Sequence, residues 1–189
     1  MNAIQTPRRL ITVGLALALL MAATRFHHFG TATFLPDASV AVFLLAGFYL
    51  RRWGVFAAFI AQAGLIDYLA IAHGGVSDWC ATAAYPFLIP AYAGAWVAGL
   101  WYAGRFRPEW RTIAPLAAAL IAGVAVWFLI SNASFYLLSG YFPELSWTEY
   151  AARVAKYFPP YLGIACAYVA LAALVHALAA SVVRAAQRA

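Results

Sequence analysis

The chain has 189 residues, of which 66% are apolar and only 10% are charged, and its mean hydropathy is +0.82. A soluble domain carries charge on about a quarter of its residues, so this composition excludes an ordinary soluble enzyme and indicates a lipid environment. The formal net charge is +6. The arginines stand between apolar segments, however, which is typical of a membrane topology signal and argues against nucleic acid as a partner.

Six apolar segments follow one another along the chain. They occupy residues 10–24, 34–50, 55–72, 86–103, 112–138 and 160–183. Because roughly 20 residues span a hydrocarbon core, we predict six transmembrane helices in one all-α integral membrane domain over residues 1–189. No room remains for a nucleotide-binding domain. The first segment also allows a signal-peptide interpretation, because Arg8 and Arg9 precede it and Ala22 and Ala23 end it.

Small residues recur on one face of the first segment. Gly14, Ala18 and Ala22 are spaced four apart, and this spacing lets another helix approach closely. Two interpretations stay open: packing within the bundle, or a docking stripe for a separate membrane partner.

Asp67 is an acid inside the third apolar segment. It lies about six residues, or roughly 9 Å, from the end of that segment. An intramembrane acid costs about 2.5–3.5 kcal/mol on insertion scales, so it normally faces a polar cavity or a partner. We therefore predict a polar pocket here, with Tyr85, Asn132 or Gln62 as hydrogen-bond partners of Asp67 if its role is structural.

The connection after the third segment carries one of the two cysteines, Cys80, close to Asp78 and Tyr85. As a thiolate, this side chain could bind a metal or react with an electrophile. A nearby carboxylate, however, raises the pKa of a thiol. The second cysteine, Cys166, falls in the last segment, where a small buried apolar role is favoured. Two cysteines so far apart exclude CxxC chemistry.

The four histidines are further candidates. His27 and His28 follow the first segment and His73 ends the third, so these three form a candidate ligand set with Cys80. Their spacing matches no zinc signature. His176, in the last segment, is interpreted as structural.

The cations favour one side of the predicted membrane. With a cytoplasmic N-terminus, three cations fall outside: Arg25, Arg153 and Lys156. The other nine fall inside: Arg8, Arg9, Arg51, Arg52, Arg105, Arg107, Arg111, Arg184 and Arg188. The positive-inside rule then places both termini in the cytoplasm. The longer connections lie outside, and one of them, with Ser146 and Glu149 at capping-box spacing, predicts a short interfacial helix over 149–157.

Three stretches carry a family resemblance: TRFHHFGTATFLPD after the first segment, LIDYLAIAHGG at the end of the third, and VSDWCATAAYPF before the fourth. With the six segments and the small-residue stripe, they resemble the substrate-binding S-components of energy-coupling-factor (ECF) vitamin transporters. The similarity is greatest to the BtuM-type bacterial cobalamin transporters, which look like solitary members of that superfamily.

The resemblance implies an S-component-like bundle in the bacterial inner membrane, with an outward-facing pocket that captures cobalamin from the periplasm. It implies docking of Gly14, Ala18 and Ala22 on a coupling subunit with two ATPases, or no such module if the protein is solitary. Since thiolate is a soft donor for cobalt, Cys80 is expected as an axial ligand of the metal, and Asp67, Tyr85, His28 and His27 as pocket residues. The protein is expected to be a transporter rather than an enzyme. Reductive removal of cyanide from cobalamin, with Cys80, Asp67 and Tyr85 taking part, is an expected secondary activity.

Other functions remain open on the sequence. One is a b-type haem electron carrier that uses His27 or His28 with His73. Another is an S-component for a metal-free vitamin, such as a flavin or thiamine, in which Cys80 has no role. A third is a thiol-dependent membrane enzyme, although no base stands at a convincing spacing from Cys80.

Overall fold

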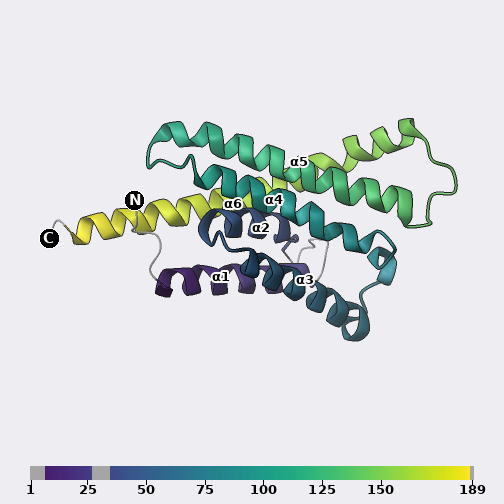
Figure 1. Cartoon of the computed structure of the whole chain (residues 1–189), viewed down its shortest axis with the longest axis horizontal. Coiled ribbons are helices and arrows are strands. Elements are labelled where there is room, and N and C mark those ends of the chain that lie inside the picture. Colours follow the sequence, from purple (N-terminus) through teal and green to yellow (C-terminus); the bar gives the residue numbers. More distant parts are fainter. Residues whose placement is uncertain (1–6, 27–34, 188–189) are drawn as a thin grey trace.

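The computed structural model describes residues 7–26 and 35–187, and its regular elements over these residues are all helical (Figure 1). The helices are α1 (Pro7–Arg25), α2 (Ser39–Tyr49), α3 (Trp53–Gly74), α4 (Leu88–Ala103), α5 (Ile113–Leu138) and α6 (Trp147–Ala186). Three 3-10 turns lie between them: η1 (Asp78–Cys80), η2 (Tyr85–Phe87) and η3 (Trp110–Thr112). The prediction of an all-α fold is confirmed.

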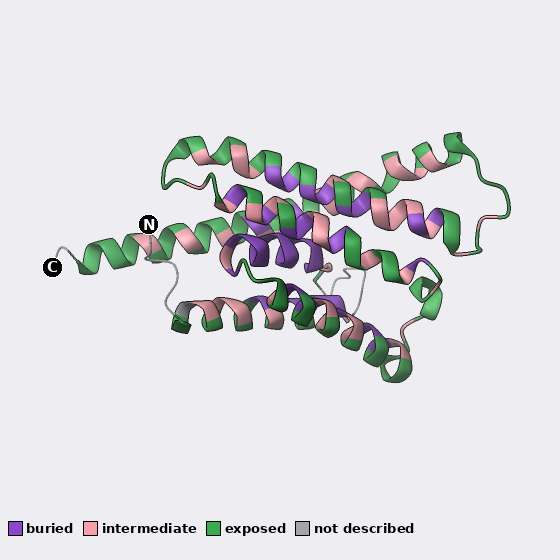
Figure 2. Cartoon of the chain, viewed as in Figure 1, coloured by how far each residue is buried: buried purple, intermediate pink, exposed green. Residues whose placement is uncertain are grey.

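Within the described residues, three helical stretches are long and apolar enough to cross a membrane: Trp53–Gly74, Trp110–Leu138 and Trp147–Ala186. Large apolar side chains also cover much of the exterior, as in a protein whose solvent is lipid. On α6, for example, Leu171, Leu174, Leu178 and Val182 are all more than half exposed. Figure 2 shows the same distribution, with buried residues gathered on α2 and α6 mostly exposed. We conclude that this is a membrane protein.

Helix α2 forms the centre of the bundle, and it is shorter than the predicted span over 34–50. Its 11 residues reach about 16 Å, and every residue from Ser39 to Phe48 is buried. The helix begins late because Asp37 binds its first residue: the Asp37 Oδ1 atom accepts from the Ser39 amide at 2.9 Å and from the Ser39 hydroxyl at 2.6 Å. The residue before α2 is bonded to α1, because the Ala38 amide donates to Thr24 Oγ1 at 3.1 Å.

Helices α2 and α4 touch backbone to backbone. A Cβ atom on Gly99 would fall on the carbonyl oxygen of Leu44, and one on Gly47 would fall on the carbonyl oxygen of Trp96. Neither oxygen can move without shifting a helix. The two glycines therefore set the distance between the central helix and α4.

Helix α6 corrects the prediction of a separate interfacial helix over 149–157. It is one helix of 40 residues with Pro159 and Pro160 inside it. The helix begins at Trp147 rather than Glu149, but the predicted cap is confirmed, because Ser146 is the N-cap and its hydroxyl accepts from the Glu149 amide at 3.5 Å. The prolines remove two backbone donors, but the chain on both sides keeps its helical path.

The connections divide the bundle into two ends (Figure 1). One end, which we call the Cys80 end, holds the last residues of α1, the α3–α4 connection with η1 and η2, and the α5–α6 connection. The other, the basic end, holds the start of α1, the α2–α3 turn, the α4–α5 connection and the end of α6.

The close contact of α2 with α4 gives a first prediction. Gly99→Ala is expected to lower the free energy of unfolding by about 3 kcal/mol. Overpacking a core usually costs about 1–3 kcal/mol, and the cost is expected to be high here because the added Cβ atom meets backbone that cannot move. Gly163→Ala on α6 is the matched control, since a Cβ atom there meets nothing within 4 Å. Thermal unfolding of both variants in detergent measures the difference. Equal melting temperatures for the two variants would show that the contact is not tight.

Candidate functional site

A buried ion pair joins α1 to α3 at the Cys80 end. Arg25 Nε donates to Asp67 Oδ1 at 2.8 Å, and Arg25 Nη2 donates to Asp67 Oδ2 at 2.7 Å. The Arg25 side chain is 3% exposed and that of Asp67 is 6% exposed. Two parallel bonds of this kind fix the relative orientation of the partners as well as their distance.

The third nitrogen of the Arg25 guanidinium extends the pairing to α2 and α4. Arg25 Nη1 donates to the Ser39 hydroxyl at 3.0 Å and to the Tyr92 hydroxyl at 2.7 Å. It also lies 3.5 Å from Asp37 Oδ2. One guanidinium therefore connects α1, the start of α2, α3 and α4, and we call these residues the Arg25 cluster.

Tyr85 brings the α3–α4 connection into the cluster. Its hydroxyl donates to Asp67 Oδ2 at 2.7 Å, which confirms one of the three partners predicted for Asp67. Gln62 instead donates to the carbonyl oxygen of Ala18 at 2.8 Å, and Asn132 Oδ1 is buried without a hydrogen-bond partner. Arg25, which binds Asp67 through two nitrogens, was missed because its position after the first apolar segment indicated an exposed charge on the outer side.

The Cys80 segment is held by stacking and capping. Trp79 lies flat on Tyr141 of the α5–α6 connection, with ring centroids 3.7 Å apart and planes within 4° of parallel. Ser77 is the N-cap of η1, and its hydroxyl accepts from the Trp79 amide at 3.2 Å. Cys80 follows as an exposed free thiol.

The Cys80 thiol lies within the electrostatic reach of the Arg25 cluster. Partial burial raises the pKa of Cys80, the Asp67 carboxylate raises it further, and Arg25 lowers it. Burial and the hydrogen bond to Asp67 likewise raise the pKa of Tyr85. At neutral pH both groups keep their protons, so Cys80 becomes a thiolate only when a strong acceptor, such as a metal ion, displaces the proton.

An aromatic wall flanks the cluster. Phe43 stacks on Tyr92 with ring centroids 4.3 Å apart, and Trp127 contacts both Tyr92 and Tyr161. Trp127 is 7% exposed, and its indole N–H has no hydrogen-bond partner among the described residues. The wall packs against the cluster through Tyr92, whose ring stacks on Phe43 and whose hydroxyl accepts from Arg25.

The remaining predicted site residues lie apart from the cluster or outside the described residues. His27 and His28 belong to residues 27–34, which the structure does not describe. His73 is exposed on the last turn of α3 beside the Tyr68 ring. Cys166 is exposed on α6 rather than buried as predicted, because α6 presents that face outside the bundle. The described residues hold no group of three or more metal-ligating side chains placed to bind an ion.

The small-residue stripe of α1 packs partly within the bundle. Gly14 faces the side chain of Leu50, and the carbonyl of Ala18 accepts the bond from Gln62 on α3. Gly14 and Ala18 are half-buried and Ala22 is exposed. These contacts favour the packing interpretation for Gly14 and Ala18.

The fold and the site together define a helical membrane protein with a buried charged cluster beside an exposed thiol. Comparison with known proteins found no protein-family model and no curated protein that matches the chain. The geometry of the Cys80 end therefore carries the functional interpretation.

The buried pair gives the second prediction. Asp67→Asn is expected to lower the free energy of unfolding by about 3–5 kcal/mol, because it leaves the Arg25 charge buried with its best partner gone. Asp37→Asn is the control, since Asp37 is 19% exposed and meets Arg25 only at 3.5 Å. Unfolding in detergent is followed by circular dichroism. A loss of stability as large in Asp37→Asn as in Asp67→Asn would contradict the central place of the pair.

Proposed function

We propose that this protein binds cobalamin at the periplasmic face of the bacterial inner membrane and carries it across. In this proposal all six helices lie in the membrane and both termini are cytoplasmic. The positions of the cations support that orientation: the α2–α3 turn, the α4–α5 connection and the end of α6 carry arginines and lie together at the basic end. The Cys80 end then faces the periplasm.

The observation that carries the proposal is an exposed thiol held beside a buried charged cluster. Cobalamin presents a cobalt ion whose axial positions exchange ligands. A thiolate is a soft donor, and coordination removes the proton that burial and Asp67 retain on Cys80. The Cys80 thiolate is therefore proposed to bind cobalt axially and to displace the vitamin's own base.

Asp67 and Tyr85 support Cys80 by position rather than as free acids or bases. Asp67 is engaged by Arg25, and Tyr85 spans from η2 to Asp67, so both anchor the connection that contains Cys80. His28 and His27 remain predicted pocket residues. The outward-facing pocket is likewise part of the proposal.

The resemblance implies a coupling subunit with two ATPases, docked on the stripe of Gly14, Ala18 and Ala22, or no such module if the protein acts alone. Removal of cyanide is proposed as a secondary activity: one electron from an external thiol reductant takes Co(III) to Co(II), and cyanide leaves with its bonding electron pair.

The third prediction concerns the spectrum of bound cobalamin. Purified protein reconstituted with cobalamin is expected to show a corrin absorption spectrum shifted from that of the free vitamin, because sulfur replaces the axial nitrogen. Cys80→Ala is expected to abolish the shift, whereas Cys166→Ala, which removes the other exposed thiol, leaves it unchanged.

The same spectra separate the rival functions. A Soret band in protein purified without added cobalamin would indicate haem and would contradict the proposal. An unshifted corrin spectrum, or one that shifts equally in Cys80→Ala, would reject cobalt–sulfur ligation.

A further inference from the structure

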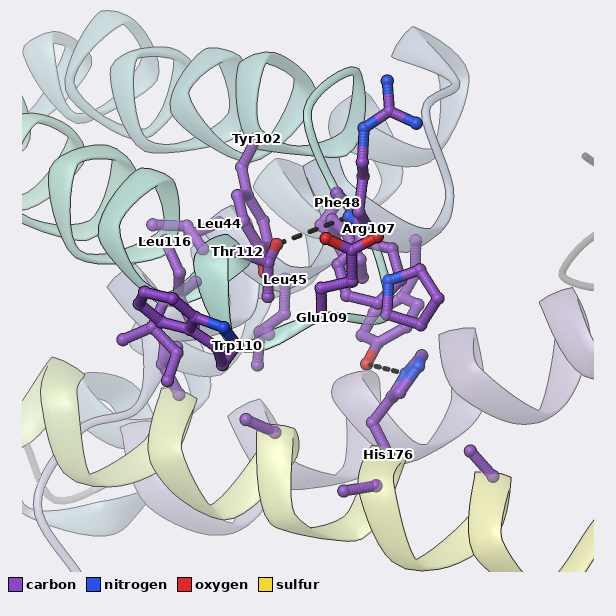
Figure 3. Close-up of a pocket in the computed structure, with 18 of the residues that line it drawn as sticks. Leu44, Leu45, Phe48, Tyr102, Arg107, Glu109, Trp110, Thr112, Leu116 and His176 are labelled. Carbon is purple, nitrogen blue, oxygen red and sulfur yellow. Dashed lines mark hydrogen bonds between the residues drawn. The ribbon is translucent and has the colours of Figure 1, made fainter.

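A cavity opens at the basic end of the bundle, away from Cys80 (Figure 3). It has a volume of about 330 Å³ and lies between α2, the α4–α5 connection, the start of α5 and the last turns of α6. Its apolar walls include Leu44, Leu45, Phe48, Ile113, Leu116 and Val169. No residue of the Arg25 cluster lines it, so the site proposed for cobalamin does not account for it.

The polar groups within this cavity are paired with each other. The Tyr49 hydroxyl lies 3.0 Å from His176 Nδ1, and the Tyr102 hydroxyl lies 3.1 Å from Thr112 Oγ1. All four residues line the cavity, and Figure 3 labels Tyr102, Thr112 and His176 among them. Since each of these groups already has one partner and the other walls are apolar, the inside of the cavity offers mainly apolar surface to an occupant.

Cations surround the opening. Arg107 and Arg184 line the cavity itself, and Arg105 and Arg111 line an adjoining hollow that shares Arg107, Glu109 and Thr112 with it. Figure 3 shows the Arg107 side chain extending away from the apolar wall. Glu109 is the one acid among these lining residues, and among the described residues both ion pairs belong to Arg25. Four guanidinium groups and one carboxylate therefore leave an excess of positive charge at the opening.

We propose that this cavity binds an anionic phospholipid, with part of one acyl chain in the apolar chamber and the phosphate on the surrounding arginines. Guanidinium groups bind phosphate oxygens through paired N–H donors, and basic pockets between membrane helices bind anionic headgroups. A soluble phosphate compound would leave the chamber empty. A zwitterionic lipid would gain less from the excess positive charge, because its own ammonium group offsets the charge of its phosphate.

This proposal does not rest on cobalamin. It requires only that the basic end lies at a membrane surface, which agrees with the apolar exterior of α6. A lipid in this position would bridge α2, α5 and α6 where the contacts of α6 leave a gap.

The test measures lipid binding by native mass spectrometry on the purified, delipidated full-length protein. The probes are palmitoyl-oleoyl phosphatidylglycerol, phosphatidylcholine with the same chains, and soluble glycerol phosphate. Phosphatidylglycerol is expected to bind at least about fivefold more tightly than phosphatidylcholine, and glycerol phosphate is expected not to compete. Arg107→Gln and Arg184→Gln are each expected to weaken phosphatidylglycerol binding about fivefold.

Matched variants separate the site from general effects. Arg52→Gln removes an exposed cation at the same end that lines neither hollow, and it is expected to leave binding unchanged. Ala173→Trp fills the chamber and is expected to weaken both lipids, whereas Ala179→Trp, on the same helix but outside the lining, does not. Circular dichroism confirms that each variant is folded.

Three results would overturn the proposal. These are equal binding of the two lipids, an effect of Arg52→Gln as large as that of Arg107→Gln, and competition by glycerol phosphate at the affinity of the lipid. The last result would identify a phosphate site without a lipid chain.

Discussion

The buried pairing of Arg25 with Asp67 is the interaction on which the Cys80 end depends. A guanidinium and a carboxylate removed from water cost several kcal/mol each unless their hydrogen-bonding capacity is filled. Here Arg25 donates to Asp67 twice and to Ser39 and Tyr92 once each. Because Arg25 and these partners come from four different helices, satisfying one cation fixes the point at which the helices meet, and Tyr85 fixes the α3–α4 connection to the same point.

The two ends of the bundle are built differently around the central helix α2. Glycine contacts hold α2 against α4, and the Arg25 cluster joins its first residue to α1. At the basic end, the last turn of α2 faces a cavity, with Tyr49 paired to His176 across it. The Cys80 end presents the thiol that is proposed to bind cobalt, and the basic end presents the arginines that are proposed to bind lipid.

Much of the fold could be predicted from the apolar segments, and the exceptions have physical causes. The segments over 55–72, 86–103 and 112–138 correspond closely to α3, α4 and α5, because a long apolar run has few alternatives to a helix in lipid. Helix α2 is shorter than its apolar run because Asp37 binds the amide of Ser39. Helix α6 is longer, because Pro159 and Pro160 interrupt hydrogen bonding without ending the helix. The hydropathy of the sequence indicates neither the late start of α2 nor the continuation of α6 through its prolines.

Less of the site could be predicted. Asp67 was recognised because an acid within an apolar run requires a partner, and Tyr85 because it lies close to Cys80 in sequence. Arg25 was missed, although an intramembrane acid is often paired with a cation and Arg25 directly follows the first apolar segment. The cavity at the basic end was missed because its arginines serve equally well as a topology signal.

Cobalt K-edge absorption spectroscopy on the complex with cobalamin tests most directly whether the thiol beside the Arg25 cluster is a metal ligand. A sulfur atom in the first coordination shell of cobalt is expected in the unmodified protein, together with loss of one axial nitrogen. A first shell of nitrogen, carbon or oxygen alone would contradict the proposed role of Cys80.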